Sequence, residues 1–359
     1  WLDGLRGCAV LMVIFYHCFL LPGGWLGVDV FFVLSGFLIT SLLVEEWETH
    51  GAISLRRFYL RRALRLLPAF YLLLLLVGLH GWLFDAAARP PHREMLLAAC
   101  YVANYPALHG TTMYSLGHTW SLSLEEQFYL IWPLLLILMF WLGKSRRWLL
   151  TAVGLGIIAC ACHRIVIYEM FRSPPEVKAA NIYRMYMGLD TRADALLMGC
   201  LIAFLATWGL LPRSTSAVRC LTWAAWASLA GLVFMARNRC MDHSQLYHGL
   251  FTIIALMVAT IIVRLLVAPA RPVARLLESR WLVGTGRISY GLYLFHMPVI
   301  HWVFPGSKLG LSWDTLGVFA LTYACALLSY HLLEAPCLRL KDRFRTQTPR
   351  IPATEKLAA

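Results

Sequence analysis

Long apolar runs separated by short polar segments make up most of this chain. Ten of them approach the roughly 20 residues that a membrane-spanning helix requires. They cover residues 5–21, 27–44, 64–84, 126–142, 149–168, 193–210, 220–236, 247–267, 287–304 and 315–335. A further run at 95–103 is too short to span a bilayer. The pattern predicts an all-α fold, a polytopic membrane helix bundle of about ten transmembrane helices.

The composition supports a membrane protein. Hydrophobic residues make up 60% of the 359 residues and charged residues 14%, which is far more apolar than an ordinary soluble domain. The ten cysteines show no spacing typical of zinc sites or redox motifs, so we expect apolar packing and no metal. We predict one transmembrane domain over residues 1–338 and a disordered basic tail over residues 339–359.

The net charge of +13 can be interpreted once its Lys and Arg residues are assigned to the two sides of the membrane. If the first residue is cytoplasmic, the alternating loops put 22 of the 32 Lys and Arg residues on the inner side. The positive-inside rule therefore predicts a cell-membrane protein with both termini in the cytoplasm. The basic balance reflects topology, so we expect no nucleic-acid partner. The first run carries Arg6 and His17 and lacks a cleavage site, so a cleaved signal peptide is not expected.

Arg6 and His17 lie eleven residues apart in the first run. At about 100° per residue they share one helix face, about 16 Å apart along the axis. Charged and ionisable groups within a membrane helix are costly and usually face protein or a wet cavity. The register predicts a functional site along this face.

A cluster of arginines precedes the third run, in the segment FYLRRALRLLP. On a helix, Arg61 and Arg62 each lie about one turn from Arg65, so their guanidinium groups gather on one side. Guanidinium forks suit phosphate. The alternative interpretation is that inner-side arginines only orient the protein in the membrane.

The segment TWSLSLEEQFY leads into the fourth run and includes its first residues. Glu125 and Glu126 point about 100° apart on a helix, so at most one of them faces a given cavity. Acidic residues in a first turn also favour the helix dipole, and Trp120 fits an interfacial aromatic belt. Both the functional and the structural interpretation stay open here.

Other polar groups lie within or beside the apolar runs. Asp29 in the second run is either an interfacial helix cap or a site residue. Arg192 and Asp194 open the sixth run, and Arg287 opens the ninth. His296 lies deeper in the ninth run, where a hydrogen-bonded structural histidine is the competing interpretation.

Several of these segments together resemble the acyltransferase-3 family of multi-pass membrane acyltransferases. They are LDGLRG with the following His17, GVDVFFVLSGFLIT, FYLRRALRLLP, TWSLSLEEQFYLIWP, TRADALLMG and GRISYGLYLFHMPV, in the family's order across residues 2–335. The resemblance implies a ten-helix membrane domain that takes an acyl group, commonly acetyl, from cytoplasmic acyl-CoA. It also implies delivery to a hydroxyl of an extracytoplasmic or lipid-linked acceptor, usually a sugar.

The resemblance also implies roles for particular residues. Arg6 and His17 match the family's Arg/His pair, Arg62 and Arg65 match its Arg-x-x-Arg motif, and Trp120, Ser121 and Glu126 match the block before the fourth span. We expect catalysis from His17, Arg6 and Glu126, with His17 as the base. We expect acyl-CoA at Arg62, Arg65 and Arg287, and the acceptor near Asp29, Trp120, Ser121, Arg192 and Asp194.

Other classes of membrane protein also place charges inside a bundle. A secondary transporter of an anionic small molecule is the alternative function. Its weakness is that the arginines concentrate at one mouth and no inverted repeat is evident. A binding or structural protein gives no reason for the register of Arg6 and His17.

Overall fold

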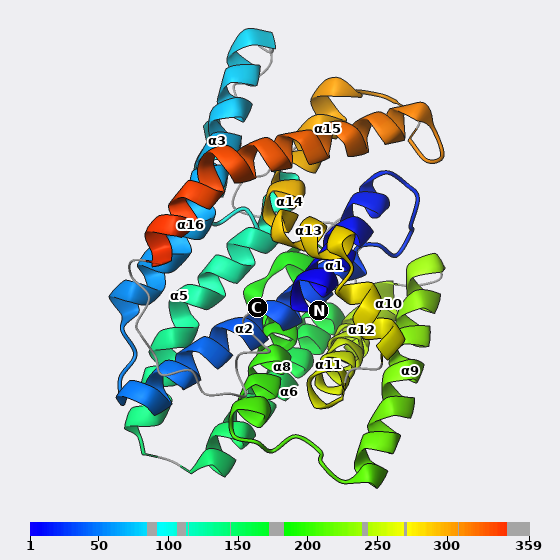
Figure 1. Ribbon diagram of the computed structural model, residues 1–359. Coiled ribbons are helices and arrows are strands. Elements are labelled where there is room, and N and C mark those ends of the chain that lie inside the picture. The colour runs from blue at the N-terminus through cyan, green and yellow to red at the C-terminus, as the bar shows by residue number, and fades with distance from the viewer. Residues whose placement is uncertain are drawn as a thin grey trace.

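The computed structural model describes residues 1–84, 92–105, 113, 115–143, 145–171, 183–238, 243–268, 271–307 and 309–342. Across these ranges the regular structure is helical and contains no strand, which confirms the predicted all-α class (Figure 1). Most of the predicted tail, residues 343–359, and His109 in the long loop lie outside the described residues.

The helices follow the predicted runs. In chain order they are α1 Leu2–His17, α2 Leu26–His50, α3 Leu55–Phe84, α4 His92–Ala99, η2 Gly117–Thr119, α5 Trp120–Trp141, α6 Arg146–Phe171, α8 Leu189–Thr207, α9 Thr215–Arg237, α10 His243–Gln245, η3 Leu246–Leu250, α11 Phe251–Val267, α12 Arg271–Leu277, α13 Arg280–Arg287, α14 Ser289–Pro298, η4 Val299–Val303, α15 Trp313–Ser329, η5 Tyr330–Glu334 and α16 Ala335–Asp342. Each of the ten predicted runs overlaps one of these helices.

The predicted count of ten spans is not confirmed. Within the described ranges, seven helical segments are long and apolar enough to cross a membrane: 26–50, 55–84, 117–141, 146–170, 215–237, 246–267 and 313–340. Three predicted runs fall short for different reasons. Helix α1 has 16 residues and α14 has 10, fewer than a span needs, and α8 carries three charged residues in its first two turns.

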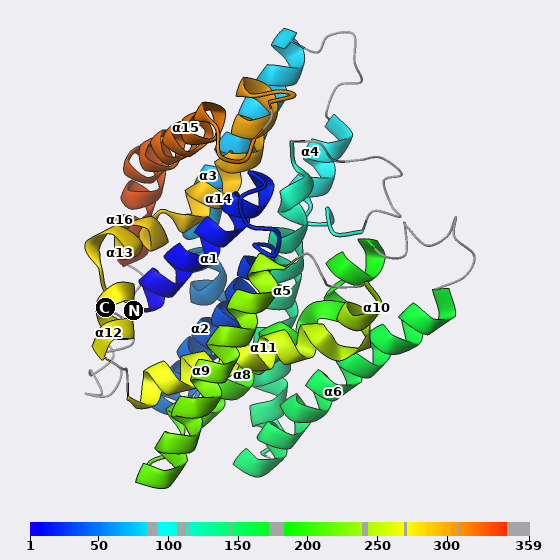
Figure 2. The same cartoon turned by 90° about the vertical axis from the view of Figure 1, so that its right-hand side faces the viewer.

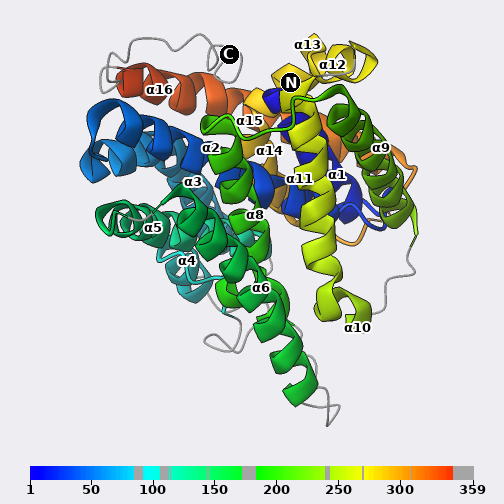
Figure 3. The ribbon, with the colours of Figure 1, turned by 90° about the horizontal axis from the view of Figure 1, so that it is seen from below.

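Large apolar side chains are exposed on the outer helices. Trp82 on α3, Trp141 on α5 and Trp223 on α9 are 75%, 80% and 72% exposed. Water would disfavour so many exposed aromatic and leucine side chains, whereas lipid tails solvate them. Helix α2 instead runs through the interior with 72% of its most apolar window buried (Figure 3). The chain is therefore a membrane protein arranged around α2.

Glycines bring the central helices into backbone contact. A Cβ at Gly36 of α2 would collide with the carbonyl of Leu196 on α8, and a Cβ at Gly199 of α8 would collide with the carbonyl of Val33. Small residues allow such close approach where lipid offers no hydrophobic drive for association. The same device joins α1 to α13, where Gly7 meets the Leu282 carbonyl (Figure 2). These contacts fix α1 and α8 against their neighbours.

We predict that Gly199→Ala destabilises the fold by about 1–3 kcal/mol, the usual cost of overpacking an interior. The added methyl has no room because its neighbour is backbone. The thermal unfolding temperature of purified protein in detergent measures the effect. Gly154→Ala on α6 is the matched control, since its added Cβ meets nothing within 4 Å. Equal unfolding temperatures for the two variants would contradict the close packing of α2 and α8.

Candidate active site

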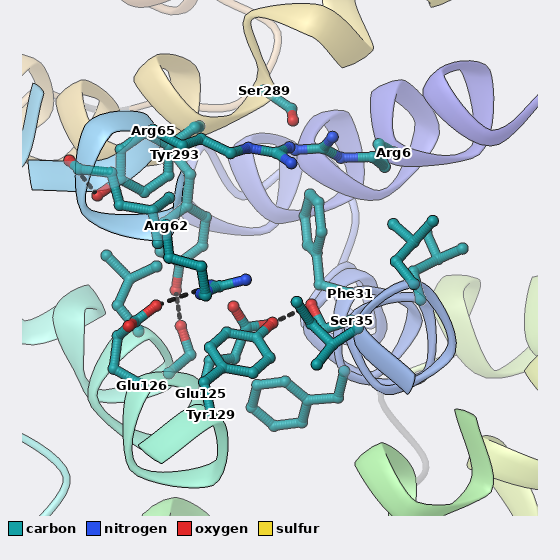
Figure 4. A pocket seen from close by; sticks show the side chains of 18 of the residues that line it. Arg6, Phe31, Ser35, Arg62, Arg65, Glu125, Glu126, Tyr129, Ser289 and Tyr293 are labelled. Carbon is teal, nitrogen blue, oxygen red and sulfur yellow. Dashed lines mark hydrogen bonds and ion pairs between the residues drawn. The ribbon is translucent and has the colours of Figure 1, made fainter. Parts of the chain in front are cut away.

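A cavity of about 190 Å³ lies among α1, α2, α3, α5 and α14. Its charged lining consists of three arginines and two glutamates: Arg6, Arg62, Arg65, Glu125 and Glu126. These side chains come from α1, α3 and α5, which are far apart in the sequence. Figure 4 shows them converging on one space, with α2 closing the opposite side. The fold therefore gathers the Arg-x-x-Arg motif, the first-helix arginine and the Glu-Glu pair into one site.

Arg62 is held firmly within this cavity. Its Nη2 donates a 2.8 Å hydrogen bond to Oε1 of Glu126, and its guanidinium lies 3.5 Å from the centre of the Tyr129 ring. Charge-assisted hydrogen bonding and a cation–π contact both stabilise a cation away from bulk water. Glu126 thus pairs with Arg62, and its catalytic role stays a prediction.

Arg6 and Arg65 lack such a partner. The shortest carboxylate distance for Arg6 is 4.0 Å, from its Nη1 to Oδ1 of Asp3, and no carboxylate oxygen of the described residues lies within 4.0 Å of Arg65. Figure 4 shows the two guanidinium groups reaching toward each other across the cavity. Two like charges in a poorly hydrated space repel each other. An anion bound between them would remove that repulsion.

Hydroxyl groups form the far wall of the cavity. The Tyr293 hydroxyl donates to the His118 carbonyl at 2.9 Å and lies 2.6 Å from Ser121 Oγ. Ser121 Oγ also lies 3.4 Å from the same carbonyl, so either hydroxyl can be the donor in the contact between them. On α2, Ser35 donates a 2.8 Å hydrogen bond to Glu125. The wall is therefore polar, and one further lining hydroxyl, Ser289 Oγ, has no hydrogen-bond partner among the described residues.

Three imidazole rings cluster beside this wall. The His296 ring lies 5.1 Å from the His17 ring and 5.1 Å from the His118 ring, between centroids. The Tyr293 ring is 5.5 Å from both His118 and His296. His17 itself does not line the cavity, whereas Tyr293 lines it and also contacts the His118 and His296 rings. In the part of the chain that the structure describes, no group of three His, Cys, Asp or Glu side chains is arranged to hold a metal ion.

Two other predicted site residues lie outside the cavity. Trp120 packs its ring against Phe32 at 6.0 Å and Tyr186 at 5.0 Å, while the neighbouring Ser121 does line the cavity. The Arg287 side chain is 62% exposed and its Nε lies 3.9 Å from Asp3 Oδ2. Arg287 therefore lies near the Arg6 end of α1 but not in the lining.

The remaining predicted residues form a separate interior network. Arg192 donates a 2.8 Å hydrogen bond to Asp29 and lies 3.6 Å over the Phe251 ring. Asp194 accepts a 2.9 Å hydrogen bond from Arg164. All four charged side chains are at most 1% exposed. The two ion pairs join α2 to α8 and α6 to α8, and none of the four residues lines the cavity.

Sequence reasoning missed Arg164 and underrated the polar wall. Arg164 lies near the end of an apolar run, and a buried cation there requires a carboxylate partner, which was a usable signal. Tyr293, Ser289 and Tyr129 were visible polar residues without an assigned role. The grouping of His118 with His296 and His17 had no sequence signal, because it depends on how η2 packs against α14.

The comparisons with known proteins agree on one family. The family described as "Acyltransferase domain" matches residues 1–331. The peptidoglycan O-acetyltransferase OatA of Listeria monocytogenes is 32% identical over 353 residues, covering 93% of this chain and 55% of the relative. A protein of Bacillus subtilis, provisionally named peptidoglycan O-acetyltransferase YrhL, is 33% identical over 353 residues, covering 93% and 54%. The chain thus spans about half the length of these relatives. No solved structure matches.

We predict that Arg164→Leu lowers the free energy of unfolding by about 3–5 kcal/mol, because it leaves Asp194 buried without its cation. Thermal unfolding in detergent measures the loss. The double variant Arg164→Leu with Asp194→Leu should recover much of it, since removing both charges abolishes the unpaired group. Arg146→Leu is the control, because its pair with Glu48 is exposed and contributes at most about 1 kcal/mol. An Arg164→Leu protein as stable as the control would contradict a stabilising role for the buried Arg164–Asp194 ion pair.

Proposed function

Because the chain belongs to this acyltransferase family, we propose that it is a membrane O-acyltransferase that transfers acetyl from acetyl-CoA to a hydroxyl of a carbohydrate acceptor. Two relatives named as peptidoglycan O-acetyltransferases support a glycan acceptor. Family membership also favours an enzyme over the alternative of an anion transporter. The observation that carries the proposal is the cavity lined by Arg6, Arg62 and Arg65.

The donor fits the charge of this cavity. Acyl-CoA is anionic through its phosphates, and guanidinium groups bind phosphate through paired N–H donors. Among the described residues, Arg6 and Arg65 have no carboxylate oxygen closer than 4.0 Å, and each would gain a counter-charge. The arginine-bearing end of α3 would then face the cytoplasm, with both termini on that side. Arg287 near Asp3 would add charge at the mouth without entering the cavity.

The cavity can also take the pantetheine arm and the thioester of acyl-CoA. The thin pantetheine arm would pass between Phe31 on α2 and the hydroxyl wall, placing the thioester near Ser121 and Tyr293. His17 and its neighbouring imidazoles lie just beyond that wall. The acceptor would approach His17 from the opposite side. Donor and acceptor thus meet where α1, α5 and α14 come together.

The proposed reaction moves one proton and one acyl group. Neutral His17 takes the proton of the acceptor hydroxyl as that oxygen attacks the thioester carbonyl carbon, forming a C–O bond. The C–S bond breaks, and the departing thiolate of CoA takes up the proton from the imidazolium. Arg6 would act at the other end of the donor, where it would hold the phosphate about 16 Å from His17 along α1. Asp29 and Glu126 make ion pairs with Arg192 and Arg62, so the proposed step assigns the proton to His17 alone.

We predict that His17→Ala lowers kcat by about 10²–10⁴-fold, the usual contribution of a general base. The assay is release of free CoA from acetyl-CoA by purified protein, dependent on added soluble peptidoglycan fragments. Binding of CoA should stay near the wild-type value, because His17 lies outside the arginine-lined cavity. Wild-type kcat in this variant would refute His17 as the base.

The arginine cavity generates a separate prediction. Combining Arg62→Ala with Arg65→Ala should raise KM for acetyl-CoA by about 10- to 100-fold, since the lost hydrogen bond from Arg65 to a charged phosphate contributes about 1.5–3 kcal/mol and Arg62 is already paired with Glu126. Arg146→Ala with Arg147→Ala removes two exposed arginines near the N-terminus of α6 and should leave KM unchanged. Equal KM values for the two double variants would contradict a phosphate site in the cavity.

A further inference from the structure

Two buried histidines in the cluster with His17 each have a ring nitrogen without a hydrogen-bond partner among the described residues. His296 is fully buried and His118 is 4% exposed. Nε2 of His296 and Nδ1 of His118 have no hydrogen-bond partner among the described residues. Buried polar atoms are nearly always paired. Bare nitrogens on two adjacent rings therefore point to a group that is absent or to a side chain that rotates.

Hydrogen bonds to the backbone fix the protons of both rings. His296 Nδ1 lies 2.7 Å from the Tyr293 carbonyl, and His118 Nε2 lies 3.1 Å from the Leu294 carbonyl. A carbonyl only accepts, so each of these nitrogens carries the hydrogen. In a neutral imidazole the other nitrogen is then an acceptor. The two free nitrogens, His118 Nδ1 and His296 Nε2, are therefore both acceptors and cannot hydrogen-bond to each other. Each of them can accept a hydrogen bond from a donor.

His17 is a neighbour of His296 whose ring can donate a hydrogen bond. Its ring centroid is 5.1 Å from that of His296, a separation at which facing ring nitrogens come within about 3 Å, the range of a hydrogen bond. The χ2 torsion of histidine is broad, so the ring turns with little strain. A neutral His17 has one N–H, and His296 Nε2 would accept it.

We propose that His296 is a positioning residue for acyl transfer: its Nε2 accepts the N–H of His17 and thereby keeps the other His17 nitrogen unprotonated toward the acceptor hydroxyl. The inference rests on the proposed function of His17 as base. A base oriented by a third group is the general arrangement for activating a hydroxyl. Here a neutral imidazole, itself fixed by the Tyr293 carbonyl, fills the place that a carboxylate often takes. The hydrogen bond persists when His17 becomes an imidazolium and spreads its charge.

The kinetic test uses full-length protein with acetyl-CoA and soluble peptidoglycan fragments. His296→Phe keeps an aromatic ring without nitrogens and should lower kcat about 10- to 100-fold with KM for acetyl-CoA unchanged. His296→Asn and His296→Gln supply a carbonyl acceptor and should exceed His296→Phe by about tenfold. His331→Phe is the matched control, since His331 is exposed on η5 and contacts only the Tyr330 ring among the described rings. Amide variants no better than His296→Phe would overturn the proposal.

A spectroscopic test works without catalysis. Solid-state NMR of the protein labelled with ¹⁵N-histidine in lipid bilayers distinguishes the two neutral imidazole tautomers. The His17 signals, identified by their loss in His17→Ala, should show a single tautomer in the wild type and a mixture in His296→Phe. If His296→Phe does not yield monodisperse protein, His296→Leu replaces it. A mixture of His17 tautomers in the wild type overturns the proposal even if acetyl transfer is active.

The two tests separate the inference from the function on which it rests. A single His17 tautomer in a wild-type protein that releases no CoA would refute the acyltransferase proposal while supporting the His17–His296 hydrogen bond. Active wild-type protein with an unchanged His17 spectrum in His296→Phe would refute the positioning role alone.

Discussion

The uncompensated positive charge of one cavity organises the account of this protein. Arg62 has Glu126 and Tyr129 as partners, whereas Arg6 and Arg65 reach toward each other with no carboxylate closer than 4.0 Å among the described residues. Guanidinium groups so placed in a membrane protein are costly unless an anion joins them. We therefore propose that an anionic ligand completes the cavity. Phosphate groups supply the required charge and hydrogen-bond acceptors.

The rest of the fold holds these arginines in position. Gly7 and Gly286 let α1 and α13 approach closely, and Gly36 and Gly199 do the same for α2 and α8. The buried pairs Arg192–Asp29 and Arg164–Asp194 then fasten α8 to α2 and α6. Breaking such a pair leaves a buried charge, so it fixes which helices can be neighbours. Rigid neighbours keep the cavity wall and the adjacent imidazoles at constant distances.

Part of this arrangement could be predicted from the sequence. Apolar run lengths predicted the helices, because a bilayer demands them, and the motif residues Arg6, Arg62, Arg65, Ser121 and Glu126 do meet in one cavity. The number of spans could not be settled this way, since α1 and α14 are short and α8 is charged. The buried ion pairs could not be predicted from the sequence either, because Asp29 and Arg192 are 163 positions apart and meet only through helix packing. The histidine cluster escaped prediction for the same reason.

The most direct test of the central claim is an experimental structure with a non-hydrolysable thioether analogue of acetyl-CoA bound. The account predicts phosphate density between Arg6 and Arg65, a pantetheine arm passing Phe31, and the acyl end at the Ser121–Tyr293 wall beside the His17 ring. Density for the analogue at any site that leaves Arg6 and Arg65 without phosphate would contradict it.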